Sequence, residues 1–234
     1  MRDGYECKAR VWVARGNRGT TSAFTCGATR AMVPETTQRT PPSGSESPLF
    51  RLLTTIVLVT IAAAPSLAAP LVRYESSGPG ALAVTGNTLG LAGDEDGPGA
   101  DDRIGVFIDA GLVLQVAGWP LGTTDDWRLA SSEAVLDLPS GATVVYAELV
   151  WGGSFEPDLL GDIDGPVMLT LPSGATVEVT PDDASAAELG AYYGRSADVT
   201  ASIVAGGRYR VGAVPASLAA EDAAAGWSLY VVYQ

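Results

Sequence analysis

The stretch LDLPSGATVVYAELVWGG, residues 136–153, decides the fold of this chain because it joins two strand-like runs through a tight turn. Pro139 suits the second position of such a turn, since its ring fixes φ near about −65°. Gly141 relieves crowding where the chain leaves the turn. The flanking residues are mostly Val, Leu, Tyr and Trp, which favour β-strands. We therefore predict a strand, a turn and a second strand here.

The heptapeptide LPSGATV occurs twice, at residues 138–144 and again at residues 171–177. After the first copy the chain continues VYAE, and after the second it continues EVTP, so the similarity ends with the repeat. A duplicated functional module would show a longer likeness. We interpret the two copies as the same turn chemistry used twice.

Short apolar runs bounded by Gly, Pro, Asp and Ser continue through residues 71–234, and long helical periodicity is missing. Strands are predicted at residues 71–75, 81–91, 103–109, 112–116, 129–138, 143–151, 167–171, 176–180, 208–214 and 227–233. Short helical segments are expected at residues 184–189, capped by Asp182 or Asp183, and at residues 198–204, whereas residues 219–225 read as a loop. The predicted fold class is all-β, a two-sheet sandwich with one or two short helices, and jelly-roll connectivity is one arrangement within that class.

The chain divides into two unlike parts near residue 68. Arg51 precedes an uncharged apolar run at residues 52–64, and Pro65-Ser66-Leu67-Ala68 follows. A positive flank, a short apolar run and small residues before the cut are typical of a secretory signal peptide, so we predict that residues 51–68 are removed on export. The alternative is an uncharged membrane anchor, but prolines interrupt the run and its strongly apolar part is short for a span.

Residues 1–50 lie upstream of that signal and show no periodicity. They are rich in Arg, Thr, Ser, Gly and Pro, and a signal peptide rarely has so long a leader. We interpret them as the result of a start codon assigned too early, with translation beginning at Met32 or nearer Leu49. A disordered tail is the competing interpretation. Residues 69–234 then form the mature domain, which is long enough for one core.

The composition of residues 69–234 excludes several function classes. The segment holds six Arg and 23 Asp or Glu, with no Lys, His or Cys, a formal charge of −17. Neither a Ser-His-Asp triad nor a Ser-Lys dyad can form, and imidazole or thiolate metal sites are excluded. The acidity argues against binding nucleic acid or anionic membranes. Paired carboxylates could hydrolyse glycosides, but nothing singles out a pair.

Two acidic loops are candidate calcium sites, because carboxylate oxygens on glycine-bearing loops suit that ion. Neither has the full spacing of an EF-hand loop. Solvated acidic loops are the alternative, and we favour it. The candidate ligands are Asp94, Asp96, Asp101 and Asp102 in the first loop and Asp158, Asp162 and Asp164 in the second.

Aromatic residues could form a platform for sugar rings. Trp151 and Trp227 lie in apolar runs, where alternation predicts core positions. Trp119 and Trp127 lie in a loop and are the better candidates for ligand contact, although covering the core is the favoured interpretation for both.

Several motifs together resemble a known family. They are the stretch at residues 136–153 that ends in WGG, ADVT at residues 197–200, AGWSLYVVY at residues 225–233, and GNTL at residues 86–89. This combination is similar to the N-terminal β-domain of large bacterial secreted or surface proteins that carry tandem conserved-repeat β-modules. The resemblance covers residues 71–234 and implies an all-β fold with no catalytic residues to carry over.

The chain departs from that family in two ways. It ends at Gln234, on a predicted strand, where family members continue into further modules, and this indicates a fragment or a truncated gene. Its mature part also lacks Lys, which excludes the Lys–Asn isopeptide crosslinks of some pilin-like surface proteins.

The leading hypothesis is a secreted or cell-surface, non-enzymatic β-sandwich module of an adhesin-like or envelope protein. It would bind an extracellular glycan or protein, or act as a structural spacer, and it would keep no membrane span after signal cleavage. The alternative is a carbohydrate-binding module that uses Trp119 and Trp127, with calcium. A carboxylate-based glycoside hydrolase is the third hypothesis.

Overall fold

Antiparallel strands build the described part of the chain, and its helical elements are single 3₁₀ turns. The computed structural model describes residues 7–13, 71–94, 97–99, 103–220 and 222–234. These residues all belong to one of the two units into which the chain divides, Met1–Phe24 together with Pro70–Gln234. The all-β class predicted from the sequence is therefore confirmed.

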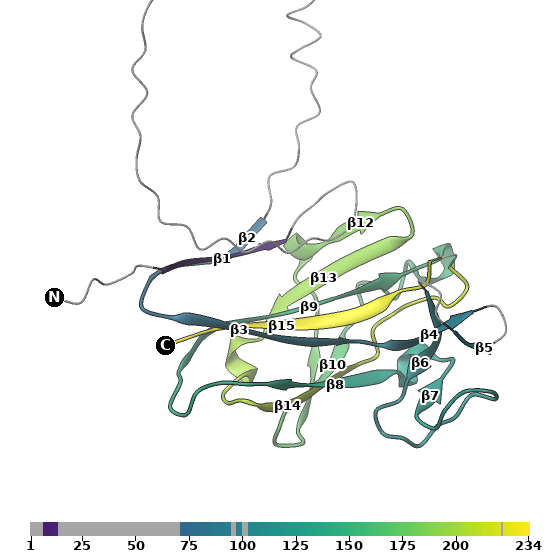
Figure 1. The fold of residues 1–234 in the computed structure, drawn as a ribbon. Helices are drawn as coiled ribbons and strands as arrows, with labels where there is room; N and C mark the ends of the chain where they lie inside the picture. The colour runs from purple at the N-terminus through teal and green to yellow at the C-terminus, as the bar shows by residue number, and fades with distance from the viewer. Residues whose placement is uncertain (1–6, 14–70, 95–96, 100–102, 221) are drawn as a thin grey trace, which may run out of the picture. The chain divides into compact units, whose positions relative to one another are not determined.

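Two larger sheets form a sandwich (Figure 1). The first sheet has the strand order β12 (Ala187–Leu189), β13 (Tyr192–Asp198), β9 (Val144–Ser154), β15 (Ala225–Tyr233) and β3 (Ala81–Thr88). The second has the order β11 (Thr176–Val179), β10 (Val167–Thr170), β14 (Gly207–Gly212) and β8 (Ser131–Leu136).

Two smaller sheets and four turns complete the described structure. The third sheet has the order β5 (Gly97–Pro98), β4 (Gly90–Asp94), β6 (Ile104–Ile108) and β7 (Thr123–Thr124). A ribbon pairs β1 (Cys7–Val13) with β2 (Leu71–Gly78). The 3₁₀ turns are η1 (Trp127–Leu129), η2 (Pro157–Leu159), η3 (Asp183–Ser185) and η4 (Thr200–Ser202).

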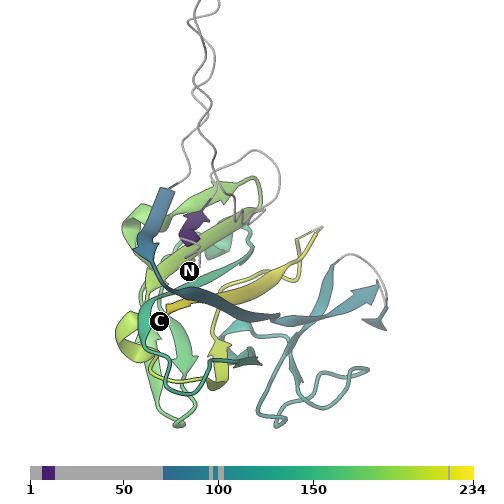
Figure 2. The same cartoon turned by 60° about the vertical axis from the view of Figure 1, so that its left-hand side comes forward.

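The strand order is that of a jelly roll. Along the chain the sandwich strands alternate between sheets: β3 lies in the first sheet, β8 in the second and β9 in the first. β10 and β11 then form a hairpin in the second sheet, and β13, β14 and β15 alternate again. The orders 3-15-9-13 and 8-14-10-11 result, which two Greek keys produce. The third sheet, β4 to β7, is inserted between β3 and β8 (Figure 2).

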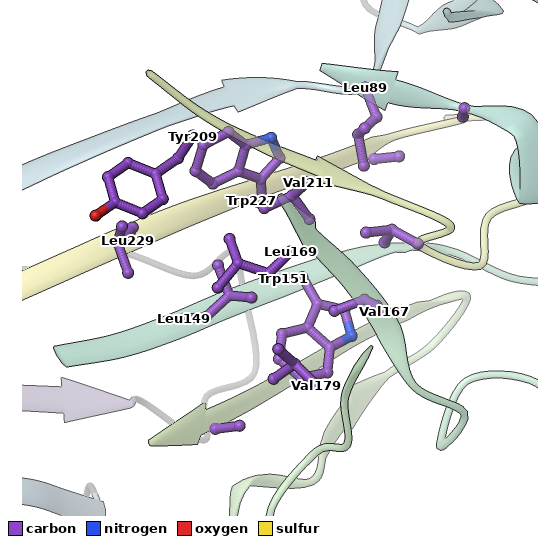
Figure 3. Close-up of a cluster of buried hydrophobic side chains, with 14 of the residues drawn as sticks. Leu89, Leu149, Trp151, Val167, Leu169, Val179, Tyr209, Val211, Trp227 and Leu229 are labelled. Carbon is purple, nitrogen blue, oxygen red and sulfur yellow. The ribbon is translucent and has the colours of Figure 1, made fainter. Parts of the chain in front are cut away.

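The core lies between the two large sheets. Alternate residues of β9 face inward, and Leu149 and Trp151 lie directly opposite Leu229 and Trp227 of β15. The second sheet covers them with inward residues of β10 and β14, as Figure 3 shows. The labelled members from these two strands are Val167, Leu169, Tyr209 and Val211. The prediction that Trp151 and Trp227 are core residues is therefore confirmed, at 2% and 3% exposure.

The two copies of LPSGATV form similar glycine turns with different roles. Gly141 and Gly174 have φ values of 81° and 85°, where a side chain would be strained. The second copy closes the β10–β11 hairpin, and Leu171 N donates to Ala175 O at 2.8 Å. The first copy carries the chain from β8 in one sheet to β9 in the other. Reuse of turn chemistry accounts for both copies.

Most strand predictions agree with the structure, but the segment at residues 112–116 was predicted wrongly. It forms an irregular loop, because the Asp109 carboxylate accepts hydrogen bonds from the amides of Val113 and Leu114. The predicted run at residues 81–91 is split between β3 and β4 at Leu89. The expected helix at residues 184–189 is also wrong, because only η3 forms before β12. The helical segment expected at residues 198–204 is present as the single turn η4, Thr200–Ser202.

Sequence reasoning missed β13, although this strand pairs with β9 over seven residues. The predictions for residues 1–50 as a leader and for residues 51–68 as a signal peptide stay predictions, because apart from β1 these residues lie outside the described ranges. Each helical turn in the described ranges is three residues long, so none could cross a bilayer.

Candidate functional site

Asp109 follows β6 and organises the loop that begins there. Its Oδ1 accepts a hydrogen bond from Gly111 N at 2.9 Å, and its Oδ2 accepts from Val113 N and Leu114 N at 2.8 and 2.9 Å. Only 8% of the residue is exposed. Burial alone would raise the pKa of Asp109, but the three backbone hydrogen bonds outweigh it, so the pKa lies below its ordinary value. Asp109 is therefore a buried anion that fixes the loop.

Three segments converge on this residue. Asp109 N donates to Gly122 O at 2.8 Å, and Gly122 N donates to Leu114 O at 2.8 Å. The neighbouring Ala110 N donates to Ser131 O at 3.1 Å, which brings in the start of β8. The backbone amides of residues 113 and 114 thus bond to a carboxylate instead of a neighbouring strand. This is why the predicted strand does not form.

The segments held by Asp109 expose aliphatic side chains. We call Leu112, Val113 and Leu121 the apolar knob; they are 61%, 78% and 57% exposed. Leu112 also adopts a φ of 54°, in the left-handed region that costs a branched side chain free energy. A hydrogen-bonded loop that exposes apolar side chains, one of them on a residue in a strained conformation, is suited to binding another surface.

A second polar group lies on the outer face of β9. Glu148 is fully buried, and its Oε1 lies 2.7 Å from Arg73 Nε of β2. Tyr146 donates its hydroxyl to the same carboxylate, and Arg73 also pairs with Asp182. Burial and the hydrogen bond to Glu148 raise the pKa of Tyr146, which stays a neutral donor. The Tyr74 ring stacks on Tyr146 with centroids 4.5 Å apart, so the group fastens β2 to the sandwich.

A third polar group surrounds Arg195 of β13. This side chain points to the core side of its sheet, beside Trp151, and is only 2% exposed although it is charged. Its Nε lies 2.7 Å from Asp164 Oδ1, and its Nη2 lies 2.7 Å from Glu188 Oε1. Its Nη1 donates to the carbonyl oxygens of Ala187 and Gly194. Burial would lower the pKa of Arg195, but these carboxylates raise it above its ordinary value. The guanidinium therefore ties β12 and the loop before β10 to β13.

The structure describes only some of the predicted calcium ligands. Asp96, Asp101 and Asp102 lie outside the described residues, and Asp94 is described only by its backbone at the end of β4. Asp158 is exposed in η2. Asp162 and Asp164 are paired with Arg128 at 3.3 Å and with Arg195 at 2.7 Å. Within the described ranges, no three metal-ligating side chains come together.

The two candidate sugar-binding tryptophans occupy different surroundings. Trp119 is only 9% exposed, and its indole lies so close over Gly105 that a Cβ there would come within 2.6 Å of it. Trp127 is half-buried in η1 and packs against the core. The Arg128 guanidinium lies 4.2 Å from its ring centroid, where a cation–π contact occupies part of the ring face.

Sequence reasoning missed the roles of Asp109, Glu148 and Arg195. One signal was readable: Asp-Ala-Gly at residues 109–111 is a turn pattern in which an aspartate accepts nearby amide hydrogens. The charge-free stretch at residues 110–124 was a second signal. The ion pairs of Arg73 with Glu148 and of Arg195 with Asp164 join residues 75 and 31 positions apart, so no local pattern predicts them. Comparison of the chain with protein-family models, with curated proteins and with solved structures found no match.

Proposed function

We propose that this protein is an exported, non-enzymatic β-sandwich module that binds a partner at the cell surface. The observation that carries the proposal is the apolar knob, a hydrogen-bonded loop that exposes three aliphatic side chains and holds Leu112 at a positive φ. A loop of this kind favours recognition over catalysis, because it presents contact area and no group that transfers protons or electrons. The signal-like segment at residues 51–68 and the family resemblance support export.

The polar groups of the described residues support the same conclusion. The buried side chains of Glu148 and Arg195 are each held by partners that tie strands together. Glu133 accepts hydrogen bonds from Arg210 and Arg208, which lower the pKa of this carboxyl despite its partial burial. Asp109 has a lowered pKa as well. Such carboxylates accept hydrogen bonds and are poor general acids for glycoside cleavage, which needs a raised pKa.

The experiment that tests the export part follows the protein in the cells that produce it. Cell fractionation and mass spectrometry of the N-terminal peptide should find the protein outside the cytoplasm, beginning at Ala69. Peptides from residues 2–30 in the mature protein, or retention in the cytoplasm, would contradict export. Hydrolysis of a defined glycan, abolished by a single carboxylate substitution, would contradict the non-enzymatic role.

A further inference from the structure

The strand β2 is attached to the sandwich by side chains, and its backbone pairs with neither of the two large sheets. Arg73 Nε lies 2.7 Å from Glu148 Oε1 of β9. The ring of Tyr74 stacks on that of Tyr146, which also belongs to β9. Within the described ranges, the backbone of β2 pairs with β1 alone. The sandwich therefore holds β2 in place and leaves its backbone to pair with a segment outside the two large sheets.

The strand that pairs with β2 comes from a distant part of the chain. β1 runs antiparallel to β2 over seven residues, from Cys7 opposite Gly78 to Val13 opposite Leu71 (Figure 1). Residues 71–78 contain no proline, so every backbone amide of β2 can donate a hydrogen bond. We call the edge of β2 that faces β1 the docking edge. The pairing with β1 shows that this edge accepts an extended segment.

Register and charge indicate which kind of segment fits the docking edge. Arg10 of β1 lies directly opposite Glu75 of β2. Opposite charges in directly opposed positions stabilise a sheet. Residues 1–24 carry five basic and two acidic residues, a formal charge of +3, whereas the predicted mature domain at residues 69–234 carries −17. A basic, extended polypeptide is therefore attracted to the domain and matches the docking edge in register.

We propose that the docking edge binds an extended, basic segment of a partner protein by strand addition, as it binds β1 in the chain that begins at Met1. Main-chain hydrogen bonds supply the affinity, and the position opposite Glu75 selects a basic residue. The inference rests on the export proposed above, because cleavage after Ala68 separates β1 from β2 and leaves the docking edge of the exported domain open. It adds a second binding surface to the apolar knob.

The test uses the full chain and a fluorescently labelled synthetic peptide of residues 5–15. The double variant Ala9→Pro/Arg10→Pro opens the docking edge. Adjacent amides of a strand point to opposite sides, so one of the two prolines removes an amide that faces β2. Fluorescence anisotropy should show that the peptide binds this variant. Binding to the wild type should be weaker by about tenfold or more, because its own β1 competes at a high effective concentration.

Amide hydrogen exchange gives a second measurement of the same edge. In the wild type, the amides of residues 71–78 that face β1 should exchange slowly. They should exchange faster in the double variant and become protected again when the peptide is added. Circular dichroism of both proteins checks that the sandwich of the double variant is intact.

A charge exchange tests the register. In the double variant, Glu75→Arg places like charges opposite each other and should weaken binding of the peptide by about threefold to tenfold. A peptide that carries Arg10→Glu should bind the Glu75→Arg protein at the original strength, because the opposite charges are restored in reverse. Asp137→Arg is the matched control: it makes the same charge change at an exposed position on the crossover turn and should leave binding unchanged.

Three results would overturn the inference. The first is a folded double variant that does not bind the peptide. The second is equal binding of a scrambled peptide, which would indicate only a general attraction between opposite charges. The third is equal binding by the wild type and the double variant, which would place the peptide elsewhere on the protein. None of these results would affect the proposed export, whereas a protein that binds the peptide but stays in the cytoplasm would overturn the export alone.

Discussion

The guanidinium of Arg73 and the carboxylate of Glu148 form an ion pair between two layers of the molecule, with Arg73 Nε 2.7 Å from Glu148 Oε1. Arg73 belongs to β2 and Glu148 to the outer face of β9. Glu148 has no exposed surface, so Arg73 and the hydroxyl of Tyr146 take the place of water as hydrogen-bond donors to its carboxylate. The pair therefore fixes the first strand of the predicted mature domain to the sandwich.

Removing Arg73 should be strongly destabilising. Arg73→Leu leaves the Glu148 carboxylate buried without its cation, and breaking such a pair costs about 3–5 kcal/mol. The free energy of unfolding, measured in urea, should fall by that order. Arg73→Leu combined with Glu148→Leu should recover most of the loss, because both partners become apolar.

The control for this prediction is Arg208→Leu. Arg208 pairs with Glu133 at the surface, and its side chain is 67% exposed, so its loss should change stability by less than about 1 kcal/mol. Equal effects of the Arg73 and Arg208 substitutions would show that Glu148 does not depend on the pair.

Asp109 should make the stability of the protein depend on pH. Its pKa in the folded state lies below the ordinary value of 3.8, so the unfolded chain binds more protons in this range. The stabilisation is present above pH 3.8 and is lost as pH falls through the lower, folded-state pKa. Asp109→Asn should reduce stability at neutral pH by about 2 kcal/mol. In the Asp109→Asn protein, the free energy of unfolding should also fall less steeply below about pH 4 than it does in the wild type.

Thermal unfolding of both proteins between neutral and acidic pH measures this difference. Asp137→Asn is a suitable control, since Asp137 is exposed on the crossover turn. If wild type and Asp109→Asn lost stability in parallel on acidification, Asp109 would not be the group responsible.

The correctly predicted strands are those in which apolar and polar residues alternate because one face of the strand is buried. In β9 and β15 the inward residues Leu149, Trp151, Trp227 and Leu229 are apolar, so the pattern was visible without the fold. β13 was missed because its inward residue Arg195 is charged and contradicts that rule. Its partner Glu188 lies across the β12–β13 hairpin, and its partner Asp164 lies 31 residues before it, so neither pairing is visible as alternation along β13.

The candidate site was predictable only in part for a related reason. The aliphatic run at residues 112–116 predicts a strand if its amides bond to a neighbouring strand, but Asp109 takes the amides of Val113 and Leu114. One buried carboxylate thus converts an apparent strand into an exposed apolar loop. The β-propensity of the residues cannot show this, because it contains no information on which acceptor a backbone amide bonds to.

Asp162 and Asp164 should contribute nothing to calcium binding. Their carboxylates already bond to Arg128 and Arg195, and a calcium ion would have to displace these cations. Asp164→Asn should lower the melting temperature equally with and without millimolar Ca²⁺. Differential scanning calorimetry measures both values. A calcium-dependent difference between wild type and Asp164→Asn would contradict this assignment and support the predicted second calcium loop.

Trp119 should act mainly in stability. Its buried indole covers Gly105, so Trp119→Ala should cost about 3–5 kcal/mol of unfolding free energy. Trp127→Ala should cost less, because this residue is only half-buried. Urea unfolding measures both changes. A glycan array with the same proteins tests the carbohydrate-binding alternative: binding by the wild type that disappears in a folded Trp127→Ala protein would favour it.

Leu112 tests whether a loop residue is kept for the stability of the fold or for its exposed side chain. Its φ of 54° strains a leucine, whereas asparagine enters this region readily. Leu112→Asn should therefore raise the free energy of unfolding by up to about 1 kcal/mol. Urea unfolding of wild type and Leu112→Asn measures the change.

A gain in stability would show that the leucine is not kept for the packing of the loop, which leaves its exposed side chain to act in binding. Ala213→Gly provides the comparison: Ala213, with a φ of 56°, is the other non-glycine residue at positive φ in the described ranges. Relief of strain there should also raise the free energy of unfolding, by up to about 1 kcal/mol. If Leu112→Asn lowered stability while Ala213→Gly raised it, the leucine would belong to the packing of the loop and not to a contact surface.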